Sequence, residues 1–546
     1  MRLPYKWQAA LIASLGLFMA VLDLTIVNVA LPQMQSSFHT DRGTITWVVT
    51  AYFLAQAAVI PVTGYLSDRF GSKTIFLGAL AIFTFGSLAC ALAPTEGALI
   101  GFRVLQGIGG GALFPTAFAI VFRVFPPMER GAASAVISIP VLLAPSFGPT
   151  IGGYLTTTFD WSAVFIVNVP IGIVAVGLGY FILRGRAADE AANMGGPQAA
   201  RGRQKFDLAG LLLSMAGVTA LVYGISEAGS TRANGTTIGW GDTTVIAYMV
   251  IGVVLLVAFV INELRVSDPV MDLRLFLNYT FTMSNVLIWA VAAFLFGSLF
   301  LLPILFENIQ GVSALNTGEI FITQGLAAAV ATVFTGRFYN KLGPRILVAV
   351  GFLLITVGTI GFINLTPTTT GASLQTWLIL RGLGLGLTNI PLQTLALSVV
   401  SNRAMARATS LLNVTRQVAS AIGISVLTTF LTTRATSHAP HVVATFKSTQ
   451  LAQVVAQAQT ACVATLGQVP GVQSCVRGIV HGKTQAYVFN HSFTQGLNDT
   501  FVFSMIATAI CIVLALLVGK DPAVEAAKRA LARGEDVERQ PVMVGE

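Results

Sequence analysis

Long apolar runs separated by short polar segments dominate this sequence. Fourteen runs reach about the length that an α-helix needs to cross a bilayer, roughly 20 apolar residues. Because lipid satisfies no backbone polar group, runs of this kind are predicted to be helices. They cover residues 8–31, 44–65, 74–93, 98–122, 131–156, 162–183, 207–227, 243–264, 279–303, 317–336, 345–364, 374–398, 408–431 and 499–519. The pattern predicts an all-α membrane protein with 14 transmembrane helices.

The first span contains a single carboxylate, Asp23, between Leu22 and Leu24. An ionised group at that depth is costly, and in membrane proteins it commonly handles protons or ions. We therefore interpret Asp23 as the proton-handling group of a membrane transporter. A helix-end acid that snorkels to water, or a structural ion pair, is the alternative interpretation.

Arg103, in the fourth span, needs a partner because an unpaired guanidinium in the membrane is also costly. At 1.5 Å per residue, Asp23 lies about 12 Å and Arg103 about 8 Å from the outer ends of their spans. This similar depth predicts that the two side chains interact, directly or through water. We assign proton coupling to this pair.

Further polar positions inside the spans are candidates for the lining of a substrate cavity. Asn413, Arg416 and Gln417 share one face of the thirteenth span, where a structural hydrogen-bond network is the alternative. Glu319, near the outer end of the tenth span, is a candidate for attracting cations or a solvated helix-end residue. The full candidate set is Asn28, Gln106, Asn413, Arg416, Gln417 and Glu319.

Composition and charge place the chain in lipid and orient it. Only 10% of the 546 residues are charged, against roughly 25% in soluble domains. With the N-terminus in the cytoplasm, 23 Lys and Arg residues fall on inner segments and six on outer segments, as the positive-inside rule requires. The net charge of +9 then faces an anionic inner leaflet and implies no nucleic-acid partner. We predict a multi-pass protein of the inner (plasma) membrane with both termini cytoplasmic.

Two related loops divide the chain into halves. Gly64–Lys73 and Gly336–Arg345 share glycines at the first and eighth positions, at an offset of 272 (336 minus 64). Arg103 and Arg381 repeat at a similar offset, 278 (381 minus 103). Parallel repeats of six spans, with substrate bound between them, are a known transporter construction. The predicted order is a six-helix bundle (1–184), a cytoplasmic linker (185–206), two inserted helices (207–264), a second six-helix bundle (265–519) and a cytoplasmic tail (520–546).

Residues 432–498 are predicted to form a long outer loop. Cys462 and Cys475 lie in it, and we expect them to form a disulfide because such bridges persist in oxidising compartments. The stretch from Val442 to Leu466 is a candidate amphipathic helix or hairpin, and the loop is a candidate docking site for an accessory protein of the envelope. The five histidines show no zinc-type spacing, so no metal site is predicted.

Four stretches resemble the major facilitator superfamily, and more closely its fourteen-span drug:proton antiporter branch. Gly64 to Lys73 matches the family's G-x-L-x-D-R-x-G-x-K loop at every specified position. Leu22 to Pro32 looks like the first-span motif of that branch, and Arg103 to Gly111 like the fourth-span motif linked with proton transfer. Gly148 to Gly153 is similar to the fifth-span antiporter motif, although Ala144 stands where a glycine is expected. The resemblance implies two six-helix bundles plus two inserted helices.

The matching residues suggest mechanical roles. In the loop, Asp68, Arg69 and Lys73 can bridge helix ends across the two bundles, and a cluster that only sets topology is the alternative. The fifth-span motif lacks bulk and one backbone donor, which favours a bendable, closely packed helix. The gating-loop residues are Gly64, Asp68, Arg69, Gly71 and Lys73, and the antiporter-motif residues are Gly148, Pro149, Gly152 and Gly153.

The sequence contains no metalloprotease motif, nucleophile elbow or paired catalytic carboxylates, so neither enzymatic activity nor a cofactor is predicted. Our leading hypothesis is multidrug efflux: a monomer that exports amphipathic, often cationic, small molecules in exchange for protons, by alternating access. One alternative is a proton-linked transporter of a specific metabolite, lipid or nutrient. Another is a non-transporting membrane sensor or scaffold.

Overall fold

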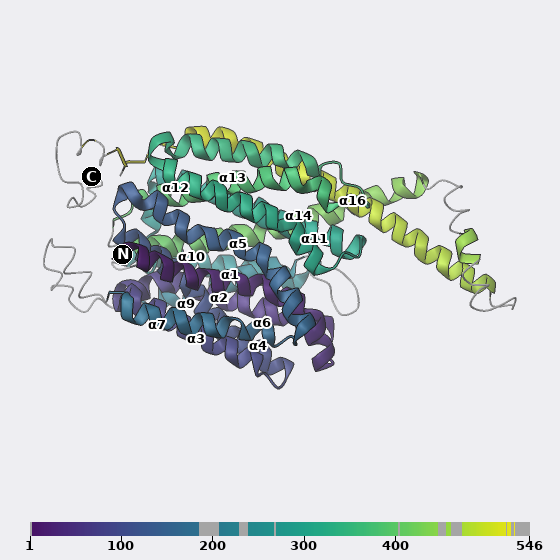
Figure 1. Ribbon diagram of the computed structural model, residues 1–546, viewed down its shortest axis with the longest axis horizontal. Coiled ribbons are helices and arrows are strands. Elements are labelled where there is room, and N and C mark those ends of the chain that lie inside the picture. The colour runs from purple at the N-terminus through teal and green to yellow at the C-terminus, as the bar shows by residue number, and fades with distance from the viewer. Residues whose placement is uncertain are drawn as a thin grey trace.

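The computed structural model describes residues 3–184, 207–228, 238–266, 269–401, 404–445, 455–459, 472–519, 521, 522, 524, 525 and 529. These residues form helices joined by turns, as the apolar pattern predicts (Figure 1). The helices are α1 (Tyr5–Phe38), α2 (Arg42–Phe70), α3 (Ser72–Ala91), α4 (Glu96–Val124), η1 (Pro127–Glu129), α5 (Arg130–Thr158), α6 (Ala163–Ile166), α7 (Asn168–Ile182), α9 (Leu208–Glu227), α10 (Thr243–Arg265), η3 (Leu273–Leu277), α11 (Tyr279–Ile304), η4 (Leu305–Ile309), α12 (Ala314–Thr359), η5 (Ile360–Phe362), α13 (Gly371–Ser398), α14 (Met405–Thr445) and α16 (Val472–Leu517).

The two related loops adopt the same backbone turn. Gly71, between α2 and α3, has a φ of 90°, and Gly343, inside α12, has a φ of 77°. Both values lie in the region that favours glycine, because a Cβ atom there would clash with the backbone. The break at Gly343 divides α12 into the two predicted spans 317–336 and 345–364. The loops therefore share a turn as well as a sequence pattern.

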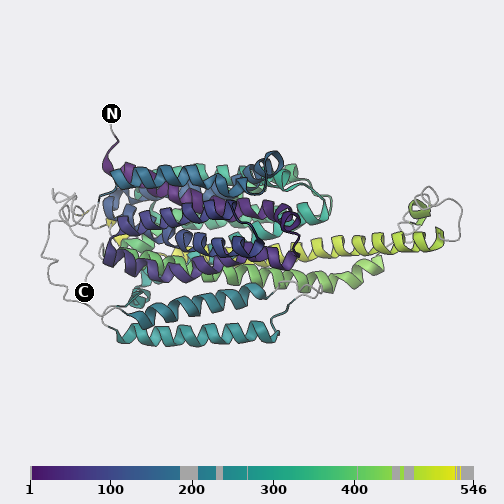
Figure 2. The same cartoon turned by 90° about the horizontal axis from the view of Figure 1, so that it is seen from below.

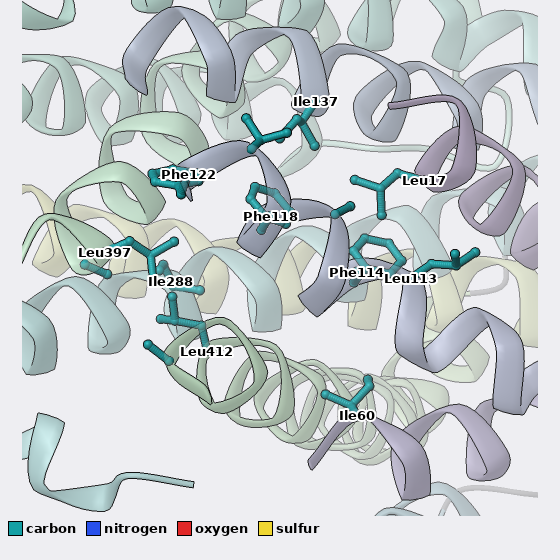
Figure 3. Close-up of a cluster of buried hydrophobic side chains, with 14 of the residues drawn as sticks. Leu17, Ile60, Leu113, Phe114, Phe118, Phe122, Ile137, Ile288, Leu397 and Leu412 are labelled. Carbon is teal, nitrogen blue, oxygen red and sulfur yellow. The ribbon is translucent and has the colours of Figure 1, made fainter. Parts of the chain in front are cut away.

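The halves meet along α5 and α12, and α14 packs on both α2 and α4. We call the end of the bundle where α1 begins, α2 ends and α14 begins the inner end. One buried hydrophobic cluster crosses the seam between the halves. Figure 3 shows aromatic side chains of α4 opposite aliphatic side chains of the second half, including Phe114, Phe118, Ile288, Leu397 and Leu412.

The inserted helices α9 and α10 pack on each other, outside both bundles, along the lower edge of the view in Figure 2. α9 also contacts α2 and α14. Trp47 of α2 stacks on Tyr223 at a centroid distance of 5.9 Å, and Ser425 of α14 donates to the Ala228 carbonyl at 3.2 Å. The insertion thus bridges one helix of each half.

Among the described residues, ten helices are long and apolar enough to cross a membrane, or eleven if the bent α5 counts as one span. α5 bends by 47° between Arg130–Ala144 and Phe147–Thr158, in a segment that contains Pro140, Pro145 and Pro149. Each predicted span falls on helical residues apart from a few at its ends, and the span 162–183 is divided between α6 and α7. The total of fourteen membrane crossings stays a prediction.

The structure differs from the expected outer loop at residues 432–498. α14 continues to Thr445, and α16 begins at Val472 and runs for 46 residues. At 1.5 Å per residue α16 is about 69 Å long, more than twice the roughly 30 Å hydrocarbon thickness. The two helices therefore project together beyond the bundle (Figure 1). Cys462 and the side chain of Cys475 lie outside the described residues, so the disulfide stays a prediction.

Candidate functional site

The Asp23 carboxylate of α1 lies at the centre of a buried polar network, with no exposed surface. Its Oδ2 accepts a hydrogen bond from Arg103 Nη1 of α4 at 2.5 Å. Its Oδ1 accepts from Gln106 Nε2 at 2.9 Å and from Asn168 Nδ2 at 3.1 Å. The predicted contact between Asp23 and Arg103 is confirmed. Three donors from three side chains therefore satisfy both carboxylate oxygens.

Arg103 is held from several sides and is 1% exposed. Its Nε donates to the Val48 carbonyl of α2 at 2.9 Å, and Nη1 also donates to Gln106 Oε1 at 2.7 Å. The guanidinium lies over the Tyr52 ring, 4.2 Å from its centroid, and 5.7 Å from that of Phe165. Cation–π contacts of this kind stabilise a desolvated guanidinium. The position of its charged head is therefore fixed by four helical segments.

Close packing by the glycines of α4 allows this geometry. A Cβ atom at Gly107 would lie 2.6 Å from the Tyr52 carbonyl oxygen, so only glycine lets α4 approach α2 this closely. That approach brings the Val48 carbonyl within reach of Arg103, one turn toward the outer end. The glycine-rich stretch after Arg103 therefore positions the arginine.

Sequence reasoning missed two members of this network. Asn168, at the start of α7, and Ser87 of α3 are both fully buried. Asn168 Nδ2 donates to Ser87 Oγ at 3.3 Å, and Gln106 Nε2 donates to the same oxygen at 3.1 Å. A lone amide in an apolar run is the signal that could have identified Asn168. Gln106, predicted to line a substrate cavity, instead belongs to this network, because the inward face of α4 directs it toward Asp23.

A second polar group lies on α14 at the seam between the halves. The Arg416 Nη2 donates to Asn413 Oδ1 at 2.9 Å, and the guanidinium lies 5.4 Å from the Phe114 centroid of α4. Both residues line a cavity of about 10 Å³, enough for about one water molecule. Its wall includes Phe118 from the first half and Ile288 from the second. Asn413 and Arg416 therefore sit between the halves, as a cavity-lining role requires.

The other cavity candidates lie elsewhere. Asn28 is exposed, and its Nδ2 donates to the Leu24 carbonyl of its own helix at 3.2 Å. Gln417 is partly exposed beside Arg416, and Glu319 is exposed in the second turn of α12. None of the three lines the cavity beside Arg416 or a second small cavity beside Arg381. Helix rotation separates Asn28 from Asp23, although the two are only five residues apart.

The loop Gly64–Lys73 after α2 contacts both halves at the inner end. Asp68 Oδ1 pairs with Arg123 Nη2 of α4 at 2.7 Å, and its Oδ2 lies 3.2 Å from Arg407 Nε of α14. Gly64 N donates to Ser410 Oγ of α14 at 3.2 Å. A Cβ atom at Gly64 would lie 2.6 Å from the Ala406 carbonyl oxygen, so glycine is required for this approach. The expected bridge between bundles is present at Asp68.

The basic residues of the loop behave differently. Lys73 Nζ donates to the Tyr180 carbonyl of α7 at 2.8 Å, so it joins helix ends within the first half and does not bridge the bundles. The expectation for Lys73 is wrong because its side chain extends from the start of α3, on the side toward α7. Arg69 Nη1 donates to Tyr65 Oη at 3.2 Å, one turn earlier on α2.

The antiporter-motif residues of α5 pack against α1 and α12. A Cβ atom at Gly148 would lie 1.9 Å from Thr25 Oγ1, and one at Gly152 would lie 2.9 Å from the Ile26 carbonyl oxygen. Gly153 faces Leu315, and Pro149 lies against Gly318 of α12. The motif therefore places α5 directly behind the Asp23 segment of α1 and along the seam with the second half.

Sequence comparison places these observations in a family. The sequence model of the Major Facilitator Superfamily matches residues 13–424. The chain is 35% identical over 429 residues to the Multidrug resistance protein B homolog of Mycobacterium tuberculosis (strain ATCC 25618 / H37Rv), covering 78% of this chain and 76% of that protein. It is 32% identical over 427 residues to the Multidrug export protein EmrB of Escherichia coli (strain K12), covering 78% and 80%.

The fold is also similar to solved transporter structures. The proton:xylose symporter XylE superposes with a TM-score of 0.57 at 13% identity, covering 96% of this chain and 98% of that one. This likeness concerns the fold alone. The match to the family model, together with apolar helices long enough to span a membrane, identifies a multi-pass membrane transporter rather than an enzyme. The chain belongs to the Major Facilitator Superfamily, with multidrug efflux transporters among its relatives.

Proposed function

We propose that this chain is a proton-coupled antiporter that exports amphipathic small molecules, often cationic, by alternating access. The observation that carries the proposal is the fully buried pair of Asp23 and Arg103. A buried membrane acid paired with an arginine can exchange the charge of that arginine for a proton. The names of the relatives, a multidrug resistance homolog and a multidrug export protein, support efflux as the direction.

The network suggests how a proton acts. When Asp23 is ionised, its charge neutralises Arg103 and both oxygens are hydrogen-bonded. A proton on Asp23 removes that charge, so the pair loses its Coulombic attraction and Arg103 keeps only neutral acceptors, Val48 O and Gln106 Oε1. Protonation of Asp23 therefore changes the free energy with which α1 packs on α4. Through this change, protonation favours one access state over the other.

The driving force is sufficient for export. One proton moving inward through 100 mV releases about 2.3 kcal/mol, and one pH unit adds about 1.4 kcal/mol. A sum of roughly 3.7 kcal/mol corresponds to a several-hundred-fold gradient of a neutral solute. Nucleotide hydrolysis is not needed.

The inner end supplies a gate for the same cycle. There α2 is held against α14 by Asp68 with Arg407 and by Gly64 with Ser410. Toward the outer end, α9 lies between the same two helices, in contact with Trp47 of α2 and Ser425 of α14. We infer that this arrangement is closed toward the cytoplasm. Opening requires that α2 and α14 separate at Asp68, and the loop then acts as a latch that favours the closed inner side.

Substrate-induced proton release from purified protein tests the coupling. We expect wild type to release protons when substrate binds, and Asp23→Asn to bind substrate without release. Asp41→Asn is the matched control. Asp41 is an exposed N-cap of α2 whose pKa is lowered by the Thr44 hydroxyl and the Thr44 backbone N–H, and Asn caps a helix equally well. Full proton-coupled transport by Asp23→Asn would refute the proposal.

Arg416 favours a second candidate, export of anionic amphipaths. Its guanidinium faces the seam, and the described residues give it Asn413 and Phe114 but no carboxylate. A carboxylate or phenolate on a substrate would supply the missing charge. Competition between matched cationic and anionic dyes decides between the classes. If anions are the substrates, Arg416→Gln lowers anion affinity and leaves cation binding unchanged; the opposite pattern favours cations.

A further inference from the structure

The second half contains a buried arginine that mirrors Arg103 but lacks its acid. Arg381 of α13 is 4% exposed. Its guanidinium lies 5.0 Å from the Phe362 centroid and 6.0 Å from the Phe501 centroid. Arg103 has the same aromatic setting, between Tyr52 and Phe165. In the described part of the chain, however, Arg381 has neither an ion-pair partner nor a hydrogen-bond partner.

A small cavity lies next to this guanidinium. It has a volume of about 10 Å³, and its wall includes Arg381 and the hydroxyl groups of Thr359, Ser504 and Thr508. Each of these three residues is less than 5% exposed. The rest of the wall is apolar, from α11, α12 and α13. Among the described residues that line the cavity, the charged group is the Arg381 guanidinium, which gives the cavity a positive potential.

The hydroxyl groups do not neutralise this charge. Thr359, Ser504 and Thr508 each donate to a backbone carbonyl of their own helical segment, at 2.7, 2.9 and 3.0 Å. Their oxygens are neutral acceptors, and each hydroxyl can rotate to donate toward a bound anion instead. Arginine cannot lose its proton in a protein, and an uncompensated buried charge is strongly destabilising. A counter-ion that enters the cavity removes this cost.

We propose that Arg381 binds one small monovalent anion of halide size in this cavity. The volume suits a species close in size to one water molecule and excludes any amphipathic substrate. Chloride is the most abundant anion that meets both conditions. The site does not depend on the proposed function, because it follows from charge and volume alone.

The two halves then differ in one functional respect. The first half neutralises its arginine with a carboxylate that can bind a proton, whereas a halide in the second half keeps its charge at any physiological pH. Proton binding would change the charge balance of the first half only. The anion is thus a fixed counter-charge that stabilises α13 against α11, α12 and α16.

Thermal unfolding of the purified full-length protein tests the site. We expect sodium chloride or bromide to raise the Tm saturably relative to sodium gluconate at equal ionic strength. Arg381→Gln should lose this halide-dependent rise. Lys6→Gln, which removes a cation that already has a carboxylate partner, Glu129, should keep it. An equal Tm of wild type in halide and gluconate would show that water alone occupies the cavity and would overturn the proposal, as would an unchanged rise in Arg381→Gln.

A second variant decides the question even if Arg381→Gln fails to fold. Ser504→Asp places a tethered carboxylate in the wall of the same cavity and recreates the pairing seen at Asp23. In gluconate, we expect the Tm of this variant to equal or exceed that of wild type. Halide should not raise its Tm further. A halide response of wild-type size in Ser504→Asp would place the bound anion elsewhere and contradict the assignment.

Discussion

Asp23 and Arg103 illustrate how a costly residue is stabilised by its surroundings. The carboxylate receives three hydrogen bonds from three different side chains, and the arginine reaches a backbone carbonyl of α2. The pair could be predicted from depth along two spans. Asn168 and Ser87 could not, because their contact with Asp23 depends on how α3 and α7 are rotated about their axes. The residue types of Asp23 and Arg103 define the charges of the pair. Helix packing determines which amide side chains surround it.

Removing only one member of the pair should be far more harmful than removing both. Arg103→Met leaves Asp23 buried without its charge partner, so we expect a loss of about 3–5 kcal/mol in the free energy of unfolding. The double variant Asp23→Asn with Arg103→Met should regain much of this loss. Denaturant unfolding of the four proteins of the cycle measures the coupling.

A surface pair provides the control for this cycle. Lys6 and Glu129 lie 2.6 Å apart, but their side chains are 28% and 40% exposed. Breaking that pair with Lys6→Met should cost less than about 1 kcal/mol. Strictly additive effects of Asp23→Asn and Arg103→Met would contradict a direct interaction between the two.

At the scale of elements, small residues decide which helices approach closely. Gly148 and Gly152 let α5 lie against the Thr25–Ile26 segment of α1, two residues beyond Asp23. The sequence motif predicts close packing, and the structure identifies the partner. The bend of 47° in α5 lies within the same element. α5 thus touches the Asp23 helix on one side and α12 of the other half on the other side.

A methyl group at Gly148 should disturb this contact. Its Cβ would lie 1.9 Å from Thr25 Oγ1, so α1 and α5 must shift apart. We expect Gly148→Ala to destabilise the protein by at least about 1–3 kcal/mol, the usual cost of overpacking, and to lower the transport rate. Unfolding free energy and initial rate of export in proteoliposomes are the measurements.

Gly177→Ala is the matched control, because a Cβ atom there would meet nothing within 4 Å. Within α7 this change should be neutral or slightly stabilising, since alanine favours helix over glycine by roughly 1 kcal/mol. If both variants had the same stability, the close approach of α5 to α1 would not matter for the fold.

At the scale of the whole molecule, the cycle that we propose requires the contacts at the inner end to break. Asp68→Asn weakens its pairs with Arg123 and Arg407, so we expect a larger population open toward the cytoplasm. Ser134, buried at the seam against Thr394, can be replaced by Cys in a background without the native cysteines. Maleimide labelling of this position from the cytoplasmic side of everted vesicles should accelerate several-fold in Asp68→Asn.

The Lys6→Gln variant serves as control for labelling, because the Lys6–Glu129 pair lies within the first half. Its labelling rate should equal that of the Ser134→Cys protein without a second substitution. A rate that is unchanged in Asp68→Asn would show that Asp68 does not hold the inner side closed.

The projecting ends of α14 and α16 form a separate unit beyond the bundle (Figure 1). We propose that they dock an accessory protein of the envelope. Arg434 and His438 of α14 contact Asp499 of α16, at 3.6 and 2.9 Å, so a deletion of residues 443–487 spares this junction. We expect the shortened protein to unfold at the Tm of wild type and to transport normally in proteoliposomes.

In intact cells the same deletion should reduce efflux, because the partner is then absent from the assembly. Accumulation of a fluorescent substrate measures this effect. Wild-type efflux by the shortened protein in cells would mean that the projection is not needed for export.

The sequence alone determined the properties that depend on local pattern. Apolar runs, charge asymmetry and repeated loops predict helices, their direction and the two related halves, because lipid forces every long apolar run to satisfy its own backbone. Depth along two spans paired Asp23 with Arg103. The tertiary structure decided every property that depends on helix rotation and contact between distant elements: the amides around Asp23, the place of Lys73 within the first half, the position of α9 between α2 and α14, and the buried Arg381 without an acid. These depend on which faces of helices meet, and that is set by packing of the whole bundle.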